Sequence, residues 1–108
     1  MKRIIVALLF TASPAAAQAP QKFTGAITDS MCPAADHARM RMGPTDAECT
    51  IACVSSHGAP YVLYAGKDTY WLSDQRTPEK FAGKKVTVTG TLDAKTSTIR
   101  VDSIAAAR

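Results

Sequence analysis

Two segments in the second half of the chain decide the fold: KVTVTGTL at Lys85–Leu92 and TIRVDSI at Thr98–Ile104. Both alternate apolar and polar side chains, which is typical of strands with one face in a core and the other in solvent. The stretch Asp93–Thr96 between them has the composition of a turn. The pattern predicts a hairpin. Its buried face should carry Val86, Val88, Ile99 and Val101.

Three further strands are predicted upstream of this hairpin. Tyr61–Tyr64 and Thr69–Leu72, joined by a turn over residues 65–68, have the composition of another hairpin. Lys22–Thr28 alternates as well and contains Gly25, and a glycine inside a strand often marks a bulge or a tight bend. The polar connection Ser73–Gly83 is expected to contain one helical turn.

Helical signals occupy the segment between the first and second predicted strands. Thr45 followed by Glu48 is a capping-box pattern, and Gly58 is a natural helix end, so we expect a helix over residues 46–57. Pro33 suits the start of a shorter helix over Ala34–Met42.

These elements predict a single mainly β domain, residues 18–108. The favoured architecture is a small five-stranded OB-like Greek-key barrel, with a helical insertion at about residues 33–58 between strands 1 and 2. An open β-sheet with a helical cap is the alternative. The tail, residues 105–108, is expected to be frayed.

The N-terminus has the pattern of an export signal. Lys2 and Arg3 precede the apolar run Ile4–Phe10, and Ala15-Ala16-Ala17 is a typical cleavage site. We therefore expect residues 1–17 to be a signal peptide and the mature domain to be periplasmic or secreted. No cysteine stands at the cleavage site, and no later segment is apolar enough for a membrane anchor.

Charge argues against a nucleic-acid partner. Cleavage removes Lys2 and Arg3, so the formal net charge falls from +4 to +2. Such a balanced domain lacks the electrostatic footprint of nucleic-acid binding. A domain this small would gain materially from a disulfide or a metal.

The cysteines and histidines give the best functional signal. Cys32, His37, Cys49 and Cys53 form a Cys₃His set that suits tetrahedral zinc, with Cys49 and Cys53 on one side of the predicted helix. The second-choice ligands are Met31, Met40 and His57. Met40 and Met42 add thioether donors, which favour Cu(I), so zinc and copper both stay open.

A disulfide is the competing interpretation, because exported thiols meet an oxidising compartment. Cys32 would pair with Cys49 or Cys53, and the domain would then be a stapled interaction module for a protein or an envelope polymer. Thiol–disulfide redox activity is disfavoured because the spacing is C-x₃-C instead of C-x-x-C. With no catalytic motif present, we expect a non-enzymatic protein.

Four phrases carry a resemblance to a known family: FTGAITDSMC (Phe23–Cys32), CTIACV (Cys49–Val54), GAPYVL (Gly58–Leu63) and FAGKKVTVTG (Phe81–Gly90). They resemble a group of small secreted bacterial proteins known only as a domain of unknown function. The resemblance spans nearly all of the mature chain. It implies an OB-type barrel with a Cys/His-bearing insertion, and it places Cys32, His37, Cys49 and Cys53 at the family's distinctive positions.

Overall fold

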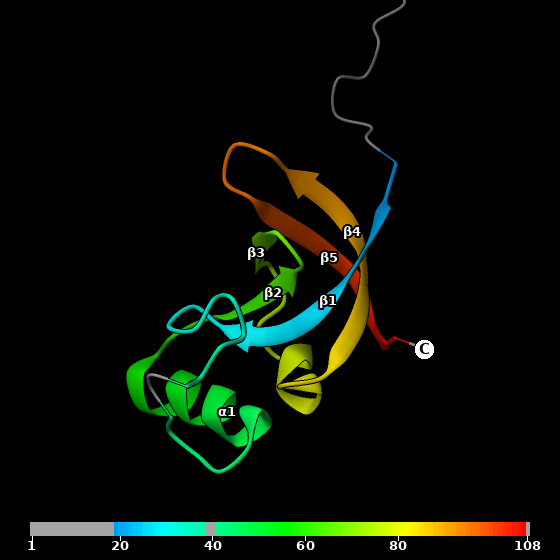
Figure 1. Cartoon of the computed structure of the whole chain (residues 1–108). Coiled ribbons are helices and arrows are strands. Elements are labelled where there is room, and N and C mark those ends of the chain that lie inside the picture. The colour runs from blue at the N-terminus through cyan, green and yellow to red at the C-terminus, as the bar shows by residue number, and fades with distance from the viewer. Residues whose placement is uncertain (1–18, 39–40, 108) are drawn as a thin grey trace, which may run out of the picture.

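The computed structural model describes residues 19–38 and 41–107, and its five strands form one sheet that closes into a ring (Figure 1). In chain order the elements are β1 (Gln21–Asp29), α1 (Asp46–His57), β2 (Tyr61–Ala65), β3 (Asp68–Leu72), the 3₁₀-helix η1 (Thr77–Phe81), β4 (Lys85–Asp93) and β5 (Thr98–Ala106). The order around the ring is β1-β2-β3-β5-β4. All pairings are antiparallel except the short parallel contact of β3 with β5.

Strand β1 closes the ring because it pairs with two neighbours along its length. Residues 21–26 pair with β4, and residues 26–29 pair with β2. The change of partner falls beside Gly25, where a Cβ atom would overlap the carbonyl oxygen of Tyr64. The bend predicted at Gly25 therefore depends on a close backbone approach. The alternative of an open sheet is wrong, since β1 and β4 join the two ends.

The interior of the ring is apolar. Alternation along the strands directs one face of each inward, and the largest of these side chains are completely buried. They are Ile27, Leu63, Val86, Val88 and Ile99. Tyr61 and Leu72 extend the same cluster.

The hairpin of β4 and β5 forms as predicted, with two differences. Val86, Val88 and Ile99 are buried, but Val101 is only partly buried, next to the register shift between Thr89 and Gly90. The expected fraying of the tail is wrong for residues 105–106. These residues pair with Val86 and Thr87, so the end of β5 is held in the sheet by its pairing with β4.

Helix α1 has the predicted bounds and caps. The Thr45 hydroxyl accepts a hydrogen bond from the Glu48 N–H at 3.1 Å. Gly58 follows in the left-handed conformation with φ 67°, and its N–H bonds back to the last turn. Figure 1 shows α1 lying across the end of the ring where β1 ends. The helix buries Cys49, Thr50 and Cys53 on the side that faces β1.

The shorter helix expected over Ala34–Met42 is wrong for the described residues of that segment, which form turns and bends. Upstream of it the backbone N–H groups of Met31 and Cys32 bond to the Asp29 carboxylate, and within it the Ala38 N–H bonds to the Asp36 carboxylate. Ala35 then adopts a left-handed backbone, φ 57°. Local side-chain bonds of this kind compete with helix formation.

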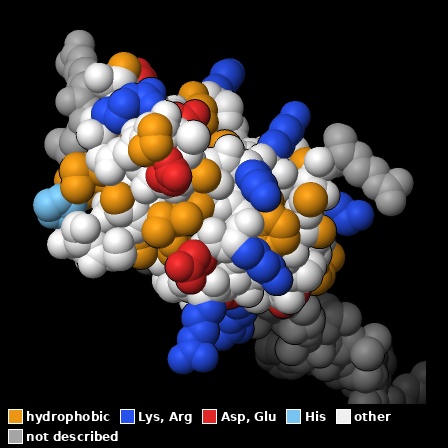
Figure 2. Space-filling view, turned by 90° about the horizontal axis from the view of Figure 1, so that it is seen from below, with side chains coloured by type: hydrophobic (Ala, Val, Ile, Leu, Met, Phe, Trp, Pro, Cys, Tyr) orange, Lys and Arg blue, Asp and Glu red, His pale blue; other side chains and the backbone are white. Residues whose placement is uncertain are grey.

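Residues 1–17, the predicted signal peptide, lie outside the described residues. Within residues 19–38 and 41–107, no helix is both long and apolar enough to cross a membrane. Figure 2 shows the molecule from below, with Lys and Arg side chains standing among hydrophobic and acidic ones on that face.

Candidate functional site

Asp29, the last residue of β1, organises the start of the insertion. Its side chain is fully buried, and its Oδ1 accepts hydrogen bonds from Met31 N at 3.0 Å and Cys32 N at 3.1 Å. These bonds turn the chain sharply and place Cys32 beside the end of the strand. The Thr28 hydroxyl secures the same turn by donating to the Cys32 carbonyl at 2.9 Å.

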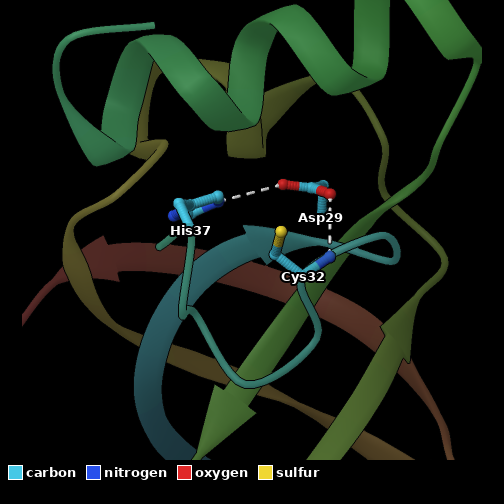
Figure 3. Close-up of side chains that lie close together, drawn as sticks. All are labelled: Asp29, Cys32 and His37. Carbon is cyan, nitrogen blue, oxygen red and sulfur yellow. Dashed lines mark hydrogen bonds and ion pairs between the residues drawn. The ribbon is translucent and has the colours of Figure 1, made fainter. Parts of the chain in front are cut away.

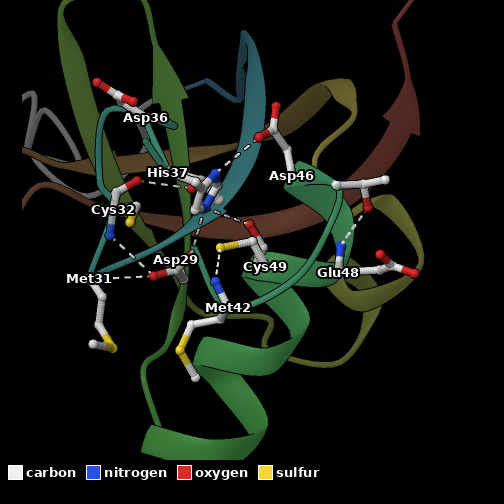
Figure 4. Close-up of polar contacts among 12 residues, drawn as sticks. Asp29, Met31, Cys32, Asp36, His37, Met42, Asp46, Glu48 and Cys49 are labelled. Atoms are coloured by element: carbon white, nitrogen blue, oxygen red, sulfur yellow. Dashed lines mark hydrogen bonds and ion pairs between the residues drawn. The ribbon is translucent and has the colours of Figure 1, made fainter. Parts of the chain in front are cut away.

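His37 enters the interior from the loop before α1. Only 2% of the residue is exposed, and Figure 4 shows its ring between β1 and the helix. Its Nε2 lies 3.3 Å from Asp29 Oδ2 and also 3.3 Å from Thr50 Oγ1. Its Nδ1 lies 3.3 Å from Oδ1 of Asp46, a residue in the first turn of α1 with an exposed side chain. The imidazole therefore has a carboxylate at each nitrogen.

Cys32 completes a group of three potential ligands. One donor atom from each of Asp29, Cys32 and His37 lies within 4.8 Å of the other two, and all three residues are buried. In Figure 3 the Cys32 sulfur points into the space between the carboxylate and the ring, below α1. Oxygen, sulfur and nitrogen donors thus converge on one small volume.

Two further sulfurs come from α1. Cys49 and Cys53 are both 0% exposed, and Cys49 Sγ accepts a hydrogen bond from Met42 N at 3.1 Å. Burial, followed by the nearby Asp29 carboxylate, Cys49 and Cys32, raises the pKa of Cys53 to about 11. Burial, followed by the charges of Asp29 and Cys49, also raises the pKa of Cys32. All three cysteines are thiols in the structure.

Hydrogen bonds within the protein satisfy the buried side-chain nitrogens and oxygens of this cluster. Among the described residues, every buried side-chain nitrogen and oxygen has a partner. With both ring nitrogens protonated, His37 can bridge Asp29 and Asp46 as an imidazolium. With Nε2 deprotonated, the same nitrogen, the Asp29 oxygen and a Cys32 thiolate can hold a metal ion. The geometry therefore supports two states that differ in protons and metal.

The structure brings some of the predicted ligands together and separates others. Cys32 and His37 share the cluster, and Cys49 and Cys53 line its helical side. His57 is exposed, Met31 is half-buried, and Met40 lies outside the described residues. Met42 is 39% exposed, and in Figure 4 the thioethers of Met31 and Met42 extend away from His37.

Sequence reasoning missed Asp29, Thr50 and Asp46. The signal for Asp29 was present, since a carboxylate directly ends a strand three residues before Cys32. Thr50 and Asp46 gave no signal of their own, because their roles depend on how α1 packs on the loop that carries His37.

Residues 55–107 match a family described as "Protein of unknown function (DUF5818)". The matched region covers the end of α1 and strands β2 to β5, so the expected similarity to an uncharacterised family is confirmed there. It does not include Asp29, Cys32, His37, Cys49 or Cys53. No curated protein and no solved structure matches the chain.

Proposed function

We propose that this protein is a metal-binding module whose buried cluster holds one zinc ion. Asp29, Cys32 and His37 supply three ligands, and a thiol of α1, Cys49 or Cys53, supplies the fourth. The observation that carries this proposal is the convergence of three different donor atoms, all buried, within 4.8 Å. Buried carboxylate, thiol and imidazole groups are costly to desolvate unless paired or bound to an ion.

The separation of two donors fits a shared ion. Asp29 Oδ2 and His37 Nε2 lie 3.3 Å apart. A charge-assisted hydrogen bond between such groups is shorter, about 2.7–2.9 Å. Two ligands on a tetrahedral zinc, each bonded at about 2.0 Å, stand about 3.3 Å apart.

Asp46 suits the role of a supporting carboxylate. It faces Nδ1 of His37, the nitrogen that the proposed metal does not use. A histidine ligand usually donates its second N–H to such a carboxylate, which fixes the ring's orientation. With a zinc ion bound, Asp46 and His37 would form the carboxylate–histidine–metal arrangement found at many zinc sites.

The donor set favours zinc over Cu(I). Cu(I) prefers thiolates and thioethers, whereas zinc accepts a mixture of carboxylate, imidazole and thiolate. The two described methionines near the cluster point away from it. Within residues 19–38 and 41–107, a Cu(I) ion at this cluster would therefore lack a thioether ligand.

The setting of this site is also part of the proposal. We infer that the ring is OB-like, supported by its strand order and by the parallel contact of β3 with β5. Its position after an N-terminal export signal indicates a bacterial protein of the periplasm or the exterior. There an ion would protect the thiols, and without it Cys32 could form a disulfide with Cys49 or Cys53.

Metal titration with matched histidine variants tests the proposal. The chain has two histidines, one in the cluster and one exposed on the same helical insertion. We expect one equivalent of Zn²⁺ to bind in competition with a chromophoric chelator, His37→Gln to weaken binding at least tenfold, and His57→Gln to leave it unchanged. Co²⁺ in place of zinc should give thiolate-to-metal charge-transfer absorption that Cys32→Ser reduces.

Two results would overturn the proposal. One is equal zinc affinity of the wild type, His37→Gln and His57→Gln proteins when circular dichroism shows all three folded. The other is a purified protein in which alkylation and mass spectrometry find a disulfide, and which takes up no zinc after reduction. The second result would favour the disulfide-stapled domain instead.

A further inference from the structure

A second candidate site lies on the outer surface of β3, β5 and β4. An open hollow of about 450 Å³ is lined by residues of the β4–β5 hairpin together with Ser73 at the end of β3. None of its lining residues belongs to the cluster of Asp29, Cys32 and His37 or to helix α1. Its volume falls within the usual range for small-molecule sites, about 300–1,000 Å³.

The register of the hairpin explains which side chains face this hollow. Leu92 pairs with Ile99, whose side chain points into the core, so the neighbouring pairs point outward. These are Thr91 with Arg100 and Asp93 with Thr98. Directly paired side chains stand about 5 Å apart, so the four polar groups form a compact outer face.

An exposed tryptophan borders this face. Trp71 of β3 is paired with Thr98, and its backbone N–H bonds to the Ser97 carbonyl at 2.9 Å. The residue is 46% exposed, although tryptophan is usually well buried. Its indole therefore offers a flat apolar surface beside a row of hydroxyl groups.

The polar groups retain bonding capacity. The Arg100 guanidinium forms no hydrogen bond or ion pair with any other described residue. Asp93 Oδ1 accepts from Lys95 N at 3.0 Å, which leaves its second oxygen to accept. The Ser73 hydroxyl accepts from Val101 N at 2.8 Å and keeps its own hydrogen to donate. Closely spaced donors and acceptors of this kind match vicinal hydroxyl groups.

The lining has no net charge, so it does not favour an anionic ligand. Asp93 and Arg100 have opposite charges, and the other polar lining groups are the neutral hydroxyls of Ser73, Thr91, Thr96 and Thr98. A peptide cannot add as an extra strand beside Thr98 and Ile99, because β5 is paired there with both β3 and β4.

We propose that this hollow binds a neutral oligosaccharide, with one sugar ring stacked on Trp71 and its hydroxyl groups bonded to Asp93 and Arg100. The hollow shares no residue with the proposed zinc site, so each proposal can be tested without the other. The chemistry needed is a ring with apolar C–H faces and equatorial hydroxyls, as in glucose or N-acetylglucosamine polymers.

The single tryptophan of the chain makes the test direct, because fluorescence excited at wavelengths that tyrosine does not absorb reports on Trp71 alone. The probes are cellotetraose, maltotetraose and the tetramer of N-acetylglucosamine, with heparin as a polyanion. We expect a saturable change in emission with at least one neutral tetrasaccharide, and weaker binding of heparin. Loss of a hydrogen bond to a charged group should lower affinity roughly tenfold in Arg100→Ala and in Asp93→Ala.

Arg76→Ala is the matched control, because Arg76 is an exposed arginine before η1 and does not line the hollow. It should bind as the wild type does. Trp71→Ala, followed by calorimetry, should abolish binding while circular dichroism remains unchanged. The proposal is overturned if no neutral tetrasaccharide alters the emission, if heparin binds more tightly than all three, or if Arg100→Ala and Arg76→Ala behave alike.

Discussion

The ring of strands and the insertion between β1 and β2 are stabilised by different chemistry. The ring encloses an apolar core of Ile27, Leu63, Val86, Val88 and Ile99, all 0% exposed. The insertion encloses Asp29, His37 and Thr50 together with three thiols. The hydrophobic effect is non-directional, whereas buried polar groups are stable only when each has a hydrogen-bond partner in the right position. The ring is therefore suited to stability and the insertion to chemistry.

The largest expected effect comes from the ring core. Ile99→Ala truncates a fully buried side chain of the hydrophobic core inside the ring, and such changes cost about 2–5 kcal/mol. Urea denaturation should show this loss equally with and without Zn²⁺. Arg100→Ala, one residue along on the outer face, should stay within about 0.5 kcal/mol of the wild type. An equally small loss of stability for Ile99→Ala would contradict the conclusion that the apolar core stabilises the ring.

The closure of the ring should respond next most strongly. In Gly25→Ala the new methyl group would overlap the Tyr64 carbonyl, so β1 or β2 must move, at a cost of about 1–3 kcal/mol. Gly58→Asn in the insertion is the contrasting variant. Gly58 has φ 67° and open space around it, and asparagine tolerates this conformation. Thermal denaturation should separate the two, and equal melting temperatures would contradict the steric account.

The thiols should make the metal-free protein sensitive to alkaline pH. In the folded state the pKa of Cys53 is raised from 9.0 to about 11. The unfolded chain therefore releases this proton first, and stability, complete below pH 9, should fall by about 1 kcal/mol per pH unit between pH 9 and 11. Cys32 acts in the same direction.

Urea denaturation in EDTA at a series of pH values measures this loss. Cys53→Ala should flatten the profile, because the titrating group is gone. Saturating Zn²⁺ should also reduce the slope, since bound thiols are already deprotonated. A profile identical in the wild type and Cys53→Ala would show that the thiol does not differ between the folded and unfolded states.

The smallest expected effect concerns the start of α1. Thr45→Ala removes the hydroxyl that accepts from Glu48 N, which costs about 1 kcal/mol at a helix N-cap. Because α1 holds Asp46 and Thr50 against His37, zinc affinity should fall along with stability. Thr45→Ser, which keeps the hydroxyl, should restore both. A loss of stability with unchanged zinc affinity would separate the helix from the site.

The strands were predictable to within a few residues because their alternation is a local property. A side chain two residues along a strand faces the same way, so Val86, Val88 and Ile99 indicated their burial without any knowledge of neighbours. Helix α1 was equally predictable, because the Thr45 cap and the Gly58 stop act within one turn. The pairing of β1 with β4 is different, since these strands are far apart in sequence and only the closed ring unites them.

The candidate site was predictable only in part. Cys32 and His37 were recognised by residue type, but the segment between them was expected to be helical. Instead, Ala35 has a left-handed backbone and the Ala38 N–H bonds to the Asp36 carboxylate, so this segment is a loop, and it carries His37 into the interior. Asp46 and Thr50 became recognisable as members of the site only when three separate segments met around one imidazole ring.

The sequence by itself determined the five strands and helix α1, the buried faces of the strands and the set of soft ligands in the first half of the chain. These follow from periodicity, capping and residue chemistry, which act over a few residues. The tertiary structure alone decided that the sheet closes and which ligands converge. It also decided that Trp71 stands beside the hydroxyl groups of the β4–β5 hairpin. Those outcomes depend on contacts between distant segments, where the position of each side chain is set by all its neighbours together.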